Sequence, residues 1–312
     1  MRIKQHDYIS SRQSPYFLPY EHRYRKSLYS HMFLEDFSGW FSSTFAPSGM
    51  RNNFYNITPE DDRLKKLLLF NYYSNFDYYF DKLLSRIVYY LLINGRTYAE
   101  IVSFMDQENT VKGVELVCIP AKYHCARFNK YRLTAQGPEN KSIQFNIDLN
   151  RLIVFDLKDI GFRRNYFRKM INHFFIFDVT NVSELMLTPK MKGIFDFEQY
   201  QQSIEYKLLK DTGPIHWLGR NYTNQHLSES YHLYRVMQYK ILRYKFLQYI
   251  LHQINAGLNN FKTEWGFVGE ISTAVSLSHY KDAFGRYSKG EINASTLCDI
   301  VIENLPPTEI KS

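Results

Sequence analysis

The residues that could bind a metal or act as nucleophiles are few, and their spacing suits neither task. Cys118 and Cys125 are too far apart for the tight cysteine pairs of a structural zinc site, and Cys298 stands alone. His124 precedes Cys125, but neighbours on a strand point to opposite faces, so they do not form a thiolate–imidazole pair. We therefore expect no metal ion and no cysteine nucleophile.

Phosphate-binding loops and hydrolytic motifs do not occur in the sequence. It contains no G-x-x-x-x-G-K-[ST] loop, no G-x-G-x-x-G loop and no G-x-S-x-G elbow, and only 14 of its 312 residues are glycine. Asp196, Glu205 and Lys207 have the residue types of a metal-dependent nuclease, but in a helix Glu205 and Lys207 lie about 200° apart. We expect no catalytic residue and no cofactor, while an enzyme with a dispersed active site stays open.

Two basic stretches are the best candidates for contact with a polyanion. The first covers residues 163–169 at the start of a predicted helix, and the second lies on a long predicted helix, away from its apolar stripe. Lysine and arginine on such faces bind phosphates without reading base sequence. A solvated surface or a contact between subunits explains the same pattern, so these alternatives stay open. The candidate nucleic-acid-binding residues are Arg163, Arg164, Arg168, Lys169, Arg235, Arg243 and Lys245.

Composition and charge describe a globular chain with a basic balance. Of the 312 residues, 45% are hydrophobic and 22% are charged, which excludes a disordered chain. The net charge of +8 favours a polyanionic partner such as nucleic acid or an acidic membrane face, while an excess spread thinly over the surface explains it as well. Three cysteines are too few for a disulfide framework, so a reducing compartment is expected. The longest apolar run, residues 87–93, is far shorter than the roughly 20 residues of a membrane span, and no membrane partner is expected.

The N-terminal half is expected to hold an arm, a long helix and a β region. Residues 1–57 are rich in Tyr, Phe, Ser and Arg with little periodicity, which favours an extended arm. A helix is predicted from Thr58, a candidate N-cap, with a bend at residues 71–75 and a stop at Asn94-Gly95. Strands are predicted over residues 97–104, 114–119, 123–133, 143–147 and 152–157, and their short links favour an antiparallel meander.

The C-terminal half is expected to be helical. Apolar residues at helical spacing predict helices over residues 162–177, 196–210, 228–254, 278–287 and 295–303. The predicted fold class is therefore α+β, with an N-terminal arm, a long helix, an antiparallel β-meander and a helix-rich C-terminal half. We expect an arm over residues 1–57, an α/β region over 58–160 and a helical region over 161–312.

The segment YYLLINGRTYAEI, residues 89–101, resembles phage portal proteins, the head–tail connector family. In that family a helix ends in an apolar segment, a polar residue and glycine. A strand with an aromatic residue, a small residue and Glu-Ile then follows. The resemblance continues through residues 113–116, 119–122 and 153–158, and it covers about residues 60–160. The chain departs from the family in being short and in having no clear clip region between two stem helices.

The resemblance implies a ring at one capsid vertex, around a channel for double-stranded DNA, that docks the packaging motor and the tail. No catalytic residue carries over, because portal proteins do no chemistry. The leading hypothesis is a portal-like homo-oligomer of a phage or prophage-derived particle, found in the virion or the host cytoplasm. It would contact double-stranded DNA through backbone charge, and capsid, tail or packaging-motor proteins through its surface. The alternatives are a nucleic-acid-binding protein of unknown fold without sequence specificity, and an enzyme with a dispersed active site.

Overall fold

The computed structural model describes most of the chain, as two compact units. The described residues are 4–5, 21–42, 54–58, 63–68, 75–105, 108, 111–119, 121, 123–127, 130–136, 142–179, 197–219, 228–259, 269–274 and 276–303. Unit 1 combines residues 1–23, 37–168 and 246–274, and unit 2 combines residues 24–36, 169–245 and 275–312. The expectations for residues 6–20 of the arm, for Asp196 and for most of the bend at residues 71–75 lie outside the described residues.

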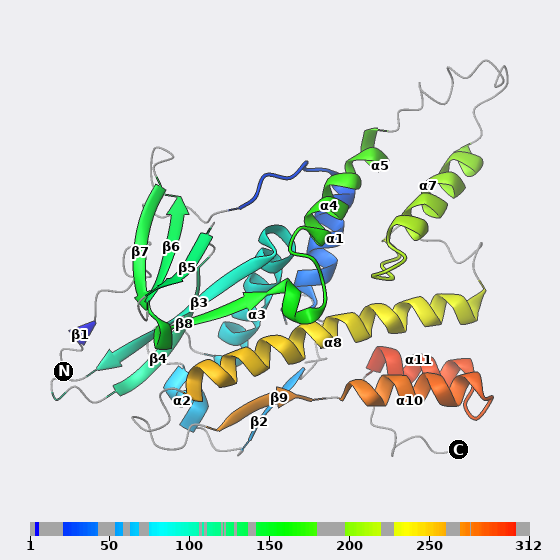
Figure 1. The fold of residues 1–312 in the computed structure, drawn as a ribbon. Helices are drawn as coiled ribbons and strands as arrows, with labels where there is room; N and C mark the ends of the chain where they lie inside the picture. Colours follow the sequence, from blue (N-terminus) through cyan, green and yellow to red (C-terminus); the bar gives the residue numbers. More distant parts are fainter. Residues whose placement is uncertain are drawn as a thin grey trace. The chain divides into compact units, whose positions relative to one another are not determined.

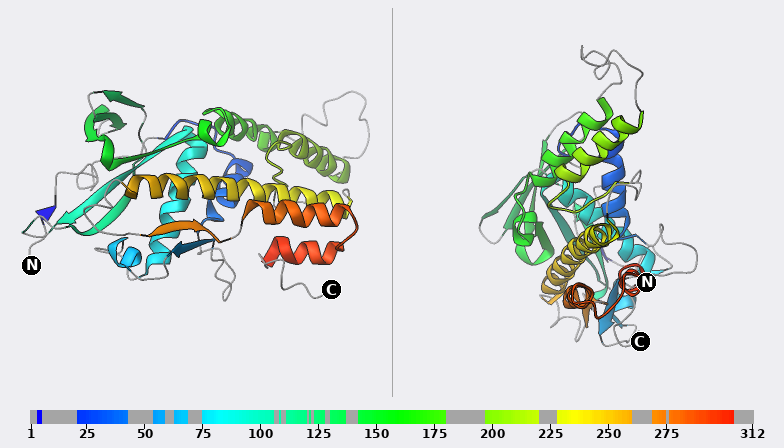
Figure 2. Two further views of the ribbon diagram at one scale, coloured as in Figure 1. Left: turned by 60° about the horizontal axis from the view of Figure 1, so that its bottom comes forward. Right: turned by 90° about the vertical axis from the view of Figure 1, so that its right-hand side faces the viewer.

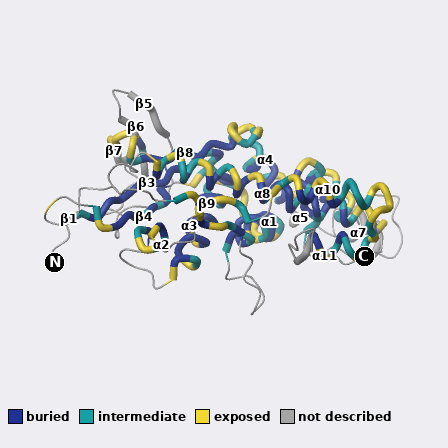
Figure 3. The backbone as a smooth tube through the Cα atoms, turned by 90° about the horizontal axis from the view of Figure 1, so that it is seen from below, coloured by how far each residue is buried: buried dark blue, intermediate teal, exposed yellow. Residues whose placement is uncertain are grey.

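A four-stranded antiparallel sheet is the centre of unit 1 (Figure 1). Strand β3 (Arg96–Met105) pairs with β4 (Val111–Ile119) on one edge and with β8 (Leu152–Asp156) on the other, and β1 (Lys4–Gln5) pairs with the far end of β3. Tyr98 lies opposite Ile119 on β4 and Val154 on β8, which fixes the register. The tube in Figure 3 is coloured as buried along nearly all of β3, because both faces of this strand are covered.

Helix α3 (Phe76–Asn94) leads directly into this sheet. It begins after Asn75, whose side-chain oxygen accepts a hydrogen bond from the backbone nitrogen of Asp77 at 2.9 Å. It ends at Gly95, which adopts the left-handed conformation with φ of 74° and donates its N–H to the carbonyl of Leu91. The chain therefore passes from helix to strand through a single glycine.

Two smaller antiparallel sheets belong to the same unit. Strands β5 (Tyr123–Arg127), β6 (Lys130–Gln136) and β7 (Ser142–Asp148) form a meander, and Leu133 and Ile147 pack with Tyr98 of β3. Strand β2 (Tyr55–Thr58) pairs with β9 (Glu270–Thr273), with Ile57 opposite Ile271. Short elements connect these parts: α2 (Arg63–Leu68) and the 3-10 turns η4 (Leu149–Arg151) and η5 (Leu157–Ile160).

The C-terminal part of helix α8 (Glu229–Asn259) covers the opposite face of β3 from the small meander. Gly257 lies against the side chains of Ile153 on β8 and Ile101 on β3, so closely that a Cβ atom there would collide with Ile153. The side chain of Asn255 donates to the carbonyl of Ile271 at 2.7 Å and accepts from its N–H at 3.0 Å. Helix α8 thereby holds both the central sheet and strand β9.

Unit 2 is built from helices around an aromatic core. Its elements are the first part of α1 (Leu28–Gly39), most of α4 (Tyr166–His173), α5 (Phe175–Val179), α7 (Phe197–Asp211), the N-terminal part of α8, α10 (Leu277–Ser288) and α11 (Ala294–Glu303). Phe33, Phe174 and Trp217 pack together with ring centroids 5.3–5.7 Å apart. In both views of Figure 2, α10 lies along α8, and Tyr234 of α8 contacts Phe284 of α10.

The α+β fold class is confirmed, and so are the helix stop at Asn94-Gly95 and the antiparallel pairing of the predicted strands. Several local predictions were wrong, among them the single strand over residues 123–133, which is two paired strands, β5 and β6. Thr58 is the last residue of β2 and not a helix cap, because Ile57 pairs with a strand more than 200 positions away. The helix predicted over residues 162–177 begins only at Tyr166 and is interrupted at Phe174.

A further error concerns the end of α8, which continues past residue 254 to Asn259. Asn255 and Gly257 are a typical stop signal, but here they serve contacts with β9 and β8. Helix α1, inside the segment expected to be an extended arm, was not predicted at all. None of the helices in the described ranges has the length and apolarity needed to cross a bilayer.

We expect Tyr79→Phe to lower the free energy of unfolding by about 2 kcal/mol. The buried Tyr79 hydroxyl of α3 donates to the carbonyl of Leu116 on β4 at 3.0 Å and accepts from its N–H at 2.7 Å, so the change leaves two buried backbone groups without this partner. Urea denaturation measures the loss. Tyr78→Phe, at the exposed neighbouring position, is the control and should change stability by less than about 0.5 kcal/mol; equal effects would contradict the role of Tyr79.

Candidate nucleic-acid interface

The basic stretch at residues 163–169 spans a loop and the first turn of α4. Arg163 and Arg164 lie in the loop between η5 and α4, and Arg168 and Lys169 lie on the helix. Arg163 and Lys169 are exposed, and Arg168 is half-buried. Lys169 belongs to unit 2, while the other three belong to unit 1.

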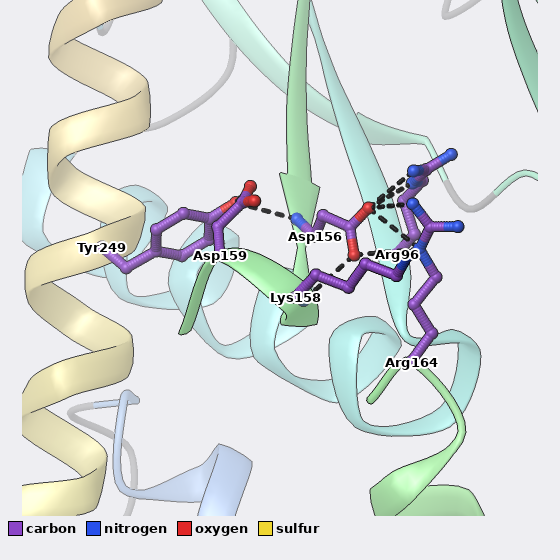
Figure 4. Close-up of polar contacts among 6 residues, drawn as sticks. All are labelled: Arg96, Asp156, Lys158, Asp159, Arg164 and Tyr249. Atoms are coloured by element: carbon purple, nitrogen blue, oxygen red, sulfur yellow. Dashed lines mark hydrogen bonds and ion pairs between the residues drawn. The ribbon is translucent and has the colours of Figure 1, made fainter. Parts of the chain in front are cut away.

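The side chain of Arg164 is bound to a buried carboxylate, Asp156 at the end of β8. Its Nε and Nη2 atoms lie 2.9 and 2.6 Å from Oδ2 of Asp156. Arg96, the first residue of β3, binds the same oxygen through Nε at 2.9 Å and Nη2 at 2.6 Å. Figure 4 shows both guanidinium groups converging on Asp156 from the same side. Two arginines thus share one carboxylate, and the group of three carries a net charge of +1.

The backbone and a tyrosine hold Asp156 in place. Its N–H donates to the hydroxyl of Tyr249 on α8 at 2.8 Å, and its Oδ1 accepts the N–H of Lys158 at 3.1 Å. Tyr249 in turn donates to Oδ2 of Asp159 at 2.9 Å, on the side of Asp156 away from the arginines (Figure 4). Burial, as the main cause, raises the pKa of the Tyr249 phenol, so the phenol keeps its proton for the bond to Asp159.

Close backbone packing fixes the loop that carries Arg164. A Cβ atom at Gly95 would collide with the backbone of Arg164, and its positive φ also favours glycine. The carbonyl of Gly95 accepts the N–H of Leu157 at 3.1 Å. Gly95 therefore ends α3 and at the same time lets the arginine loop lie against the start of β3.

We name Arg96, Lys158, Arg163 and Arg164 the β8 cation cluster. Lys158 and Arg163 are exposed, the side chains of Arg96 and Arg164 are 23% and 41% exposed, and that of Asp156 only 9%. The positive groups therefore face solvent more than the carboxylate that holds them. Arg96 and Lys158 were missed by sequence reasoning, which looked for runs of basic residues; the position of Arg96 directly after the Asn94-Gly95 stop was the available signal.

Arg235, by contrast, lies inside unit 2, so its predicted place on a polar face of α8 was wrong. The residue is 1% exposed. Its Nη2 donates to Oγ1 of Thr212 at 3.0 Å and to the carbonyl of Trp217 at 3.1 Å, and its Nη1 donates to the carbonyl of Leu209 in the last turn of α7 at 3.3 Å. A cation is favourable at the negative end of a helix, so Arg235 ties α8 to the end of α7.

The two other candidates on α8 have different surroundings. Arg243 is half-buried, with its guanidinium 4.0 Å from the centre of the Tyr239 ring, and it donates to the backbone carbonyl of Asp36. That position argues for a structural role and against phosphate binding. Lys245 is exposed, as predicted. Whether Lys245, Arg168 and Lys169 contact nucleic acid stays a prediction.

Burial strongly shifts the pKa values of Cys118 and Lys240. Burial raises the pKa of the Cys118 thiol to about 12, so it is not a thiolate near neutral pH. Burial, followed by the charge of Arg243, lowers the pKa of Lys240 on α8 to about 7. Its Nζ lies 5.3 Å from the centre of the Tyr280 ring on α10. Within the described ranges, no three His, Cys, Asp or Glu side chains are placed to share a metal ion.

We expect Arg235→Met to lower the free energy of unfolding by about 2–4 kcal/mol, because it removes the buried guanidinium that donates to Leu209, Thr212 and Trp217. Lys245→Met, at an exposed position on the same helix, is the matched control and should cost less than about 0.5 kcal/mol. Denaturant midpoints measure both. A small loss for Arg235→Met would contradict its structural role.

We expect the stability of the protein to rise with pH between about 7 and 10 through Lys240. The folded state releases the proton at a pKa of about 7, while the unfolded chain keeps it to its ordinary pKa near 10.5. In that range the unfolded state binds more protons, so the unfolding free energy rises by up to about 1.4 kcal/mol per pH unit.

Urea midpoints at pH 7, 8 and 9 measure this slope. Lys240→Met should remove most of it and stabilise the protein at pH 7, while Lys245→Met should keep the slope of the unchanged chain. A Lys240→Met variant with an unaltered slope would refute the assignment.

Comparisons with known proteins found similarity to solved structures, and the likeness described here is a distant one. No protein-family model matches this sequence, and no curated protein matches it. Among solved structures, the chain is similar to a chain of the virion of a native gene transfer agent (GTA) particle. That likeness has 13% identity and a TM-score of 0.35, and it covers 96% of this chain and 98% of the other. At these values it assigns this chain neither a family nor a role.

Proposed function

We propose that the protein is a portal-like structural protein: a homo-oligomeric ring of a phage or prophage-derived particle that serves as a conduit for double-stranded DNA. The observation that carries the proposal is the passage from α3 through Gly95 into β3. This segment bears the resemblance to portal proteins, and its helix–glycine–strand order is the one that the resemblance implies. Capsid, tail or packaging-motor proteins would then be its partners, and the virion its location.

Contact with DNA is supported by the β8 cation cluster. Its four cations come from β3, η5 and the loop before α4, and nearby backbone contacts at Gly95 hold these elements together. The acids bonded there are Asp156, which both arginines cover, and Asp159, which lies on the other side with Tyr249 (Figure 4). A solvent-facing positive group of this kind binds backbone phosphates and carries no base-reading geometry.

The second candidate is a nucleic-acid-binding protein that forms no ring. The observation that favours it is that the β8 cation cluster is complete within unit 1 of a single chain. Binding to phosphates then needs no second copy. The two candidates differ in assembly and share the same contact with DNA, so assembled mass separates them.

We expect native mass measurement of the full chain to give one closed species of about a dozen subunits. The expectation follows from the portal-like assignment, since a DNA channel needs a ring. The measurement is made at micromolar concentration and at two salt concentrations, to exclude non-specific association. A stable monomer or dimer would rule out the ring and leave the second candidate.

We expect affinity for a random-sequence duplex to fall steeply as salt increases, and Arg163→Gln and Lys158→Gln to reduce that dependence by about 0.9 for each lost phosphate contact. Fluorescence anisotropy with a labelled duplex measures both affinity and slope. Lys66→Gln, which removes one exposed charge from α2, is the control and should leave the slope unchanged. Equal binding at low and high salt would contradict a phosphate-dominated contact.

A further inference from the structure

Arg96 and Arg164 differ from a flexible surface cation because both are bound to the carboxylate of Asp156. Each guanidinium uses its Nε and Nη2 atoms on Asp156, so both side chains are fixed in orientation. The N–H groups on Nη1 of Arg164 point away from that carboxylate and have no hydrogen-bond partner among the described residues. Arg164 therefore keeps donors for a second acceptor.

Hydrogen bonds and close packing of the surrounding backbone hold Asp156 and the arginine loop in place before any ligand binds. Tyr249 holds the N–H of Asp156, Gly95 holds Leu157, and the backbone of Arg164 packs on Gly95. A binding group that is already fixed loses little conformational freedom on binding. Free surface lysines have no such advantage.

We propose that Arg96 and Arg164, positioned by Asp156, form one seat for a single phosphodiester of a nucleic-acid backbone. Planar guanidinium groups match the oxygens of a phosphate, whereas an ammonium acts as a point charge. The net charge of +1 suits a singly charged phosphodiester, and the exposed Lys158 and Arg163 suit its neighbours along the strand. The seat rests on the proposed contact with DNA, and it assigns Asp156 as a positioning residue.

Binding of DNA by positive charge alone and binding by the positioned pair of arginines predict different affinities for two variants. Asp156→Asn raises the local charge from +1 to +2, so an unstructured positive patch would bind a duplex more tightly. Arg164→Lys keeps the charge, so a patch would bind equally well. The seat predicts that both variants bind about tenfold more weakly. Asp156→Asn loses the carboxylate that orients the two guanidinium groups, and Arg164→Lys loses one of these groups.

The experiment measures the dissociation constant for a labelled 30-base-pair duplex by anisotropy, for the full chain and each variant. Arg132→Lys is the matched control: Arg132 is exposed on β6 and lies outside the β8 cation cluster, so the same exchange of guanidinium for ammonium there should leave affinity unchanged. Circular dichroism and native mass confirm that each variant is folded and assembled as the unchanged protein is. If Asp156→Asn does not fold, Arg164→Lys and Arg96→Lys still decide the question, since both keep the ion pairs.

The outcomes are distinct. Loss of affinity in Arg164→Lys and Asp156→Asn, with Arg132→Lys unaffected, supports the seat. Unchanged or tighter binding in both overturns the seat but leaves DNA contact intact, whereas a full chain that does not bind duplex at 50 mM salt overturns the proposed DNA contact itself. Competition by inorganic phosphate, compared with chloride at equal ionic strength, identifies the source: efficient displacement that Asp156→Asn abolishes would mean a seat for free phosphate and would refute the phosphodiester assignment.

Discussion

The candidate interface of unit 1 depends on one constraint, the buried carboxylate of Asp156. Taking a charge out of water is costly unless it is paired and hydrogen-bonded, and here the side chain accepts from two guanidinium groups and one backbone N–H. These bonds join the start of β3, the end of β8 and the loop before α4, while Tyr249 adds α8. The position of the positive surface thus follows from one negative group beneath it.

Arg164 and Arg235, both candidates for nucleic-acid binding in the sequence, have different roles in the structure. Arg164 is held at the surface by a carboxylate, while Arg235 is enclosed among backbone carbonyls at the end of α7. In both cases the charge is stabilised, in one by an ion pair and in the other by carbonyl groups and the helix dipole. Only the first arrangement leaves a cation facing solvent.

The elements that follow from local periodicity were predicted well, and those that depend on distant partners were not. The stop of α3 at Asn94-Gly95 needs only a left-handed glycine, which local sequence specifies. Strand β2 is only four residues long and exists through pairing with β9, so Thr58 resembled a helix cap instead. At Gly257 the closeness of Ile153 explains a glycine that looked like a helix end.

By itself, the sequence determined the α+β class, most helix and strand positions and a basic stretch with Arg163 and Arg164, because these depend on neighbours along the chain. The tertiary structure alone decided which cations reach solvent. Arg96 joins Arg164 because β3 and β8 pair antiparallel with Arg96 opposite Asp156, and Arg235 is buried because the end of α7 packs on α8. Burial and ion pairing join residues far apart in sequence, and no local pattern encodes them.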